Sequence, residues 1–146
     1  MSLIERITAE KLLAHGRLLS KFMPNSQRLT LKQNLRSEEG EYFAKLVIDL
    51  DKRISEMPHT YQTEAIEVPD KIVHLHYFLG NIDAWIIEKD MYCDRGSPQL
   101  QAYGKATLYG YGFNSAGWGY ISIQEYIESG VELDLYWTPK PVKECK

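Results

Sequence analysis

The spacing of hydrophobic residues changes at Pro58, and this change limits the chain to folds that combine helices with a sheet. Before Pro58, apolar side chains recur about every 3.6 residues, the repeat of an amphipathic α-helix. After Pro58 they alternate with polar residues, the repeat of a strand with one buried face. Ser37 is expected to cap the helix and Pro58 to end it. The helical stripe comprises Phe43, Leu46, Val47, Leu50, Ile54 and Met57.

An earlier helix is expected from Ala9 to about Met23. Thr8 can cap its N-terminus, and Pro24 stops it. Residues 24–36 are polar and basic and are expected to form a loop. The sequence therefore predicts two helices before the first strand.

Five strands and one short helix are expected after Pro58. The short helix begins at the capping box formed by Ser122 and Glu125 and ends at Gly130. Residues 110–119 are rich in glycine and are expected to turn tightly. We expect an α+β fold, with two N-terminal helices packed on a mainly antiparallel sheet and a short helix near the C-terminus. The expected strands are residues 61–67, 71–78, 84–90, 101–109 and 131–137.

Composition excludes several classes of protein. The chain has 146 residues, of which 44% are hydrophobic and 25% charged, typical of a single globular domain over residues 1–146. No apolar run approaches the roughly 18 residues of a membrane span, and the charged N-terminus lacks the apolar core of a signal peptide. Cys93 and Cys145 form no metal-binding or CxxC pattern. We expect a cytoplasmic protein with reduced thiols and no membrane partner.

Charge is unevenly distributed along the chain. The net charge is −3, which argues against a dedicated nucleic-acid binder. Residues 1–36 nevertheless carry a net +5, and residues 37–70 a net −6. A basic helix facing an acidic one in solvent would give this pattern. A phosphate-binding arm would give it too, and its candidate residues are Arg17, Arg28, Lys32 and Arg36.

The histidines His74 and His76 lie two residues apart on an expected strand, so both point to one face. With a five-residue turn at 79–83, position 74 would face Glu88, and position 72 would face Asp90. His74, His76, Glu88 and Asp90 would then share a face and could bind a divalent metal such as Zn²⁺. His74 and Glu88 could instead act as a metal-free acid/base pair of a hydrolase. A sheet with one solvated face shows the same alternation.

Aromatic residues are concentrated among five glycines between Tyr103 and Tyr120. Large rings give contact area at low entropic cost, so the segment suits a protein-binding surface. It also suits base stacking, and turns and a core would need the same residues. The candidate binding residues are Tyr109, Tyr111, Phe113 and Trp118.

Several short segments resemble a bacterial family of unknown function, the one numbered 2958, which is frequent on plasmids, phages and other mobile elements. The resemblance covers residues 9–17 and 70–142, and residues 24–66 would be an insertion or a divergent segment. It implies a mobile-element setting, with a role in defence or counter-defence, and no particular reaction. The segments that carry it are 12–17 (LLAHGR), 77–80 (YFLG), 83–90 (DAWIIEKD), 103–104 (YG), 119–125 (GYISIQE), 132–135 (ELDL) and 139–141 (PKP).

The sequence leads us to expect a small cytosolic protein-interaction module whose partner is a protein. No convincing catalytic set appears in the sequence, which favours binding over catalysis. The alternatives are a hydrolase that uses the histidine face, with or without a metal, and a nucleic-acid binder that uses the basic segment.

Overall fold

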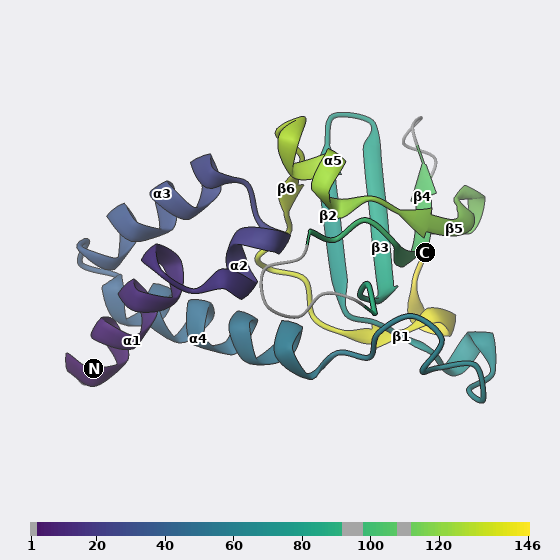
Figure 1. Ribbon diagram of the computed structural model, residues 1–146, viewed down its shortest axis with the longest axis horizontal. Coiled ribbons are helices and arrows are strands. Elements are labelled where there is room, and N and C mark those ends of the chain that lie inside the picture. The colour runs from purple at the N-terminus through teal and green to yellow at the C-terminus, as the bar shows by residue number, and fades with distance from the viewer. Residues whose placement is uncertain (1–2, 92–97, 108–111) are drawn as a thin grey trace.

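Residues 3–56 form four helices, where the sequence predicted two. In a computed structural model that describes residues 3–91, 98–107 and 112–146, these helices are α1 (Leu3–Ala14), α2 (Arg17–Phe22), α3 (Asn25–Leu35) and α4 (Gly40–Glu56). Figure 1 shows them gathered on one side of the molecule, beside the sheet.

The predicted first helix is broken at Gly16. An added Cβ there would lie 2.4 Å from the Leu12 carbonyl oxygen, so only glycine allows the two short helices to approach this closely. Thr8 lies inside α1, where its hydroxyl donates to the Ile4 carbonyl, and it is not a cap.

The loop predicted at residues 24–36 is also wrong, because this stretch contains α3. Pro24 ends α2 and at the same time serves as the N-cap of α3. Leu31 and Leu35, four residues apart, are the buried side chains of α3, and the polar remainder of the helix hid this pair in the sequence.

Helix α4 confirms the hydrophobic stripe, although it begins at Gly40 and not directly after Ser37. Ala44, Val47, Leu50 and Ile54 are its buried residues beyond Gly40. The Ser37 hydroxyl instead accepts from the Glu39 backbone N–H in the turn before α4.

A mainly antiparallel sheet follows, as predicted, in the order β5-β4-β3-β2-β6. A separate pair joins β1 (Ile72–Val73) and β7 (Lys140–Pro141). Short 3₁₀ turns lie at η1 (Val68–Asp70), η3 (Phe113–Ser115) and η4 (Val142–Glu144). In Figure 1, β6 lies on the side of the helices and β5 on the opposite side. The main strands are β2 (Leu75–Leu79), β3 (Ile82–Glu88), β4 (Ala102–Thr107), β5 (Gly117–Ile121) and β6 (Glu132–Leu133).

Three strand predictions differ from the structure. Residues 61–67 form turns and not an edge strand, and Tyr61 has a left-handed backbone with φ 75°. The expected strand at 131–137 is reduced to Glu132–Leu133. Strand β5 occupies part of the stretch predicted to turn. Helix α5 (Ile123–Glu128) follows Ser122, whose hydroxyl accepts from the Glu125 N–H.

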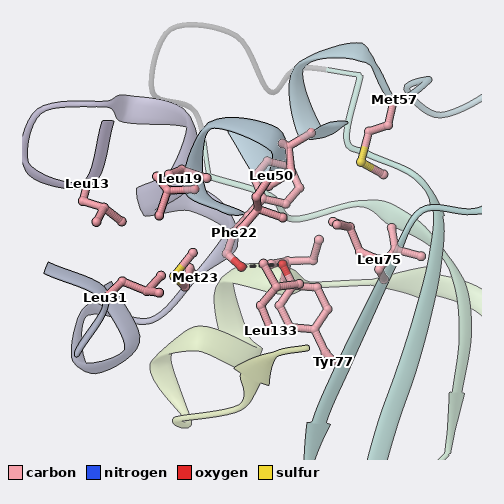
Figure 2. Close-up of a cluster of buried hydrophobic side chains, with 14 of the residues drawn as sticks. Leu13, Leu19, Phe22, Met23, Leu31, Leu50, Met57, Leu75, Tyr77 and Leu133 are labelled. Atoms are coloured by element: carbon pink, nitrogen blue, oxygen red, sulfur yellow. Dashed lines mark hydrogen bonds between the residues drawn. The ribbon is translucent and has the colours of Figure 1, made fainter. Parts of the chain in front are cut away.

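The core lies between the helices and one face of the sheet. Leucine and aromatic side chains of α1–α4 meet Leu75, Tyr77 and Leu133 there (Figure 2). Tyr77 is fully buried, and its hydroxyl donates to the Phe22 carbonyl at 2.5 Å. Burial raises the pKa of Tyr77 well above its ordinary value. No helix among the described residues is long and apolar enough to cross a membrane.

The other face of the sheet carries a smaller buried cluster: Val73, Trp85, Ile87, Phe113 and Cys145. The η3 turn and the C-terminal residues cover part of this face. Trp118 and Tyr120 point to the same face, because they pair with Lys105 and Tyr103 across β4.

Candidate protein-binding surface

Strand β5 is an exposed edge of the sheet. The β2–β3 hairpin has a two-residue turn, so its flanking pair, Leu79 and Ile82, is hydrogen-bonded. Along each antiparallel strand, hydrogen-bonded pairs alternate with non-hydrogen-bonded pairs, and a residue directs its N–H and C=O to only one of the two neighbouring strands. Following this alternation from Leu79 and Ile82 across β3 and β4, the backbone groups of Gly119 point to β4. Those of Trp118 and Tyr120 therefore point away from the sheet. No backbone hydrogen bond of these two residues to a segment beyond β4 occurs among the described residues.

The alternation has an independent check at the opposite edge. Because His76 lies three residues from the hydrogen-bonded position Leu79, the alternation directs the backbone groups of His76 away from β3. The His76 carbonyl indeed accepts from the Asp134 N–H at 2.8 Å, on the β6 side.

Four aromatic rings lie beside this edge, and we call Tyr61, Tyr103, Trp118 and Tyr120 the aromatic surface. Tyr120 and Tyr61 are each 54% exposed and Trp118 is 37% exposed. The Tyr103 ring stacks on Trp118 with centroids 6.0 Å apart and meets Tyr120 edge to face at 5.6 Å. Exposed rings clustered in this way are typical of protein-binding sites.

Two charged side chains of the sheet, Lys105 and Glu88, support the aromatic surface. Lys105 lies 4.3 Å from the Phe113 ring centroid and 5.3 Å from that of Trp118, and it donates to the Phe113 carbonyl. The buried Glu88 carboxylate accepts from the Tyr61 and Thr63 backbone N–H groups and from the Thr63 hydroxyl. These contacts fix the turn that carries Tyr61 against the sheet.

The hydroxyls of Tyr61 and Tyr120 share a hydrogen bond. This bond raises the pKa of Tyr120, because deprotonation would remove the shared proton.

The predicted binding residues separate in the structure. Trp118 is exposed as expected, whereas Phe113 is 2% exposed and belongs to the smaller buried cluster. Tyr109 and Tyr111 lie outside the described residues. Tyr61 was not a candidate in the sequence, and no local pattern singles it out. Tyr120 follows a Gly-Trp-Gly-Tyr alternation that marks a strand once glycine is accepted within it.

The predicted register of the His74–Glu88 hairpin is wrong by one residue. The turn comprises Gly80 and Asn81 and not five residues, and φ of Gly80 is 55°. His76 therefore faces Trp85, with ring centroids 5.3 Å apart. No hydrogen bond joins His74 to Glu88 within the described part of the chain.

The predicted metal ligands do not form a metal site. Within residues 3–91, 98–107 and 112–146, no three His, Cys, Asp or Glu side chains converge as ligands would. His76 is held between two carboxylates, with Nδ1 3.0 Å from Asp134 and Nε2 2.9 Å from Asp83. The Asp90 carboxylate accepts from the N–H groups of Leu100 and Gln101.

His74 is buried enough to lose much of its basicity. Burial, together with the Arg53 charge, lowers the pKa of His74 to about 4. The ring is therefore neutral at physiological pH. His76, in contrast, connects β2 to β3 through Asp83 and to the segment after β6 through Asp134.

The predicted nucleic-acid-binding residues lie on two neighbouring helices. Arg17 begins α2 and is exposed, as is Arg36 at the end of α3. Lys32 is half-buried. Arg28 donates to the Leu13 carbonyl and to the Asn25 side chain, so its guanidinium is partly occupied by the protein.

A groove of about 780 Å³ lies elsewhere, between α4 and residues 135–138. Two of its cations are already paired along α4, Lys45 with Glu41 and Arg53 with Asp49. Nothing in the groove selects one ligand, so the aromatic surface is the stronger site.

No family model matches the chain, and neither a curated protein nor a solved structure matches it.

Proposed function

We propose that the protein is a protein-binding module that takes an extended segment of its partner at β5. One observation carries the proposal: Trp118 and Tyr120 direct backbone N–H and C=O groups to the open side of the edge, and their rings are exposed beside it. Strand addition at such an edge gives affinity through main-chain hydrogen bonds and specificity through side-chain contacts.

The character of the edge supports this function. Folded proteins protect their edge strands with proline, charged side chains or short length. Strand β5 has five residues, none of them proline or charged. The opposite edge strand, β6, has only two residues. An unprotected edge flanked by rings is expected where a binding partner will cover it.

The proposal fits the setting that the sequence resemblance implies. A small cytosolic module of a mobile element would act by binding a host or element protein, in defence or counter-defence. We keep this setting, and the family membership of residues 9–17 and 70–142, as proposals that rest on the resemblance alone.

Selection of peptides tests the function. A displayed library of random 12-residue peptides is selected on the whole protein. Binding of the enriched peptides, carrying a fluorescent label, to the wild type, Trp118→Ala and Tyr136→Ala is then measured by fluorescence anisotropy. Tyr136 is 70% exposed and lies outside β5, in the segment between β6 and β7, so Tyr136→Ala is the matched control. We expect Trp118→Ala to weaken binding about tenfold or more, and Tyr136→Ala to leave it unchanged. Failure of a monomeric wild type to enrich any peptide, or equal effects of both variants, would contradict the proposal.

A second candidate function, nucleic-acid binding, is favoured by one observation. Residues 11–36 contain six Lys and Arg and no Asp or Glu. None of the six forms an ion pair within the described residues. This unneutralised charge could contact phosphates, and its test is the salt dependence given in the Discussion.

A further inference from the structure

We propose that the segment bound at the β5 edge is β5 of a second copy, so that the protein forms a homodimer about a twofold axis through Gly119. This inference rests on the proposed function, because it uses the same edge. It is argued from the self-complementarity of residues 117–121.

Antiparallel pairing about Gly119 completes the edge. Trp118 of each copy lies opposite the second copy's Tyr120, and these are the two residues whose backbone groups point outward. Each copy offers two N–H and two C=O groups, so the pair forms four hydrogen bonds and leaves none of these groups unpaired. A shift by two residues pairs Trp118 or Tyr120 with a residue outside β5. The central register is therefore the one that satisfies the whole strand.

The side chains match in the same register. Trp118 and the second copy's Tyr120 become cross-strand neighbours, and the symmetry repeats this contact on the other side of the axis. Aromatic pairs at opposed positions of an antiparallel ladder stabilise it. Both rings are exposed in the single chain, so the dimer would remove them from water.

Glycine occupies the axis. The two copies of Gly119 would form a non-hydrogen-bonded pair, in which the backbones approach to about 4.5 Å between Cα atoms. A Cβ added to Gly119 or Gly117 meets nothing within 4 Å in the single chain, so neither glycine is required by this chain's own packing. In the dimer, Gly117 would lie opposite the second copy's Ile121.

The open space at Gly119 also provides a clean test. Gly119→Lys and Gly119→Glu place a charged side chain at the axis, where an added Cβ meets nothing within 4 Å inside the chain. Each variant alone would bring two like charges together in the dimer. A mixture would bring opposite charges together and restore pairing.

The experiment is sedimentation velocity over a concentration series for the wild type, each variant and their equimolar mixture. We expect a wild-type dimer, and a dissociation constant raised at least about a hundredfold in each variant alone. The mixture should recover a heterodimer. Gln33→Lys, an equal charge change on exposed α3, should leave the wild-type dimer unchanged. Circular dichroism checks that all variants fold.

Other outcomes overturn the inference in distinguishable ways. A wild-type dimer that is insensitive to both Gly119 variants, or a mixture that stays monomeric, shows that β5 is not the dimer contact. A wild-type monomer that still binds the selected peptides through Trp118 would rule out the homodimer and leave the proposed function intact. A wild-type monomer that binds no peptide would rule out both the homodimer and the proposed function.

Discussion

The Tyr61 and Tyr120 side chains, 59 residues apart in the chain, share a hydrogen bond between their hydroxyls. This bond connects the turn after α4 to the exposed edge of the sheet. Tyr61→Phe should therefore bring the pKa of Tyr120 down towards its ordinary value, since the bond to Tyr61 is the largest cause of its elevation. Ring resonances of labelled tyrosine, followed by NMR through alkaline pH, measure the change. Tyr136→Phe is the control, and an unchanged Tyr120 titration in Tyr61→Phe would contradict the assignment.

Stability should fall as the solution is acidified from pH 6.5 to about 4, partly through His74. Above pH 6.5 the ring is neutral in both folded and unfolded chains. Between pH 6.5 and 4 only the unfolded chain takes up the proton, and below pH 4 the loss is complete. The loss is about 2 kcal/mol at most, because a partly solvated ring feels only part of the full effect.

His74→Gln should flatten this part of the pH profile. Urea denaturation at several pH values measures the difference from wild type. His15→Gln, a change at an exposed histidine, should leave the slope unchanged. Equal slopes for His74→Gln and wild type would show that the ring titrates normally.

The Tyr77 hydroxyl should stabilise the contact between the sheet and the helices. Tyr77→Phe removes the hydrogen bond to the Phe22 carbonyl and leaves that buried acceptor unpaired. We expect a loss of about 2 kcal/mol in the free energy of unfolding. Tyr126→Phe, at a half-buried ring, should cost less than about 0.5 kcal/mol. Similar losses in the two variants would refute a specific role for the Tyr77 bond.

His76 and Asp83 should be energetically coupled. The ring bridges Asp83 and Asp134, so removing it leaves two half-buried carboxylates without their shared hydrogen-bond partner. His76→Gln should destabilise the fold by about 1–3 kcal/mol. A double-mutant cycle with Asp83→Asn should give a coupling of at least about 0.5 kcal/mol. Strict additivity of the two stability losses would mean that the contact between His76 and Asp83 contributes no net interaction energy.

The nucleic-acid candidate predicts a steep salt dependence. If the basic helices bind phosphates, affinity for a labelled duplex, measured by fluorescence anisotropy, should fall sharply between about 50 and 200 mM salt. Replacing Arg17, Lys21 and Arg36 by Gln should lower the salt slope by about one for each phosphate-binding side chain removed. Replacing three exposed cations elsewhere (Lys45, Lys52 and Lys143) is the control. A flat salt profile would contradict phosphate binding.

The α4 stripe and the sheet class were predictable because both depend on a local hydrophobic repeat. Helix α3 was missed because two leucines in a polar segment are too weak a repeat to predict burial. Strand β5 was missed because Gly117 and Gly119 alternate with the rings and resemble turn residues. The period of two is present, but glycine has no side chain to display it.

The hairpin register shows a different limit. Glycine at position 80 allows a two-residue turn, whereas the sequence was interpreted as a five-residue one. One residue of difference moved His76 away from Ile86 and onto Trp85. The histidine face therefore depended on a turn length that composition alone does not set.

The binding surface was predictable only in part. Trp118 was identified from composition, since exposed rings among glycines are typical of binding segments. Phe113 was wrong because the η3 turn directs it under the sheet, between Trp85 and Lys105. Tyr61 reaches the surface through the Glu88 contacts with its turn, which are tertiary and leave no local signal.

Hydrogen exchange at three consecutive amides tests the central claim most directly. At low protein concentration, the Trp118 and Tyr120 amides should exchange rapidly, whereas the Gly119 amide, directed to β4, should be protected. When the edge is covered, by a selected peptide or at high protein concentration, both Trp118 and Tyr120 should become protected. Protection of these two amides at every concentration without a partner, or fast exchange after binding, would contradict strand addition at β5.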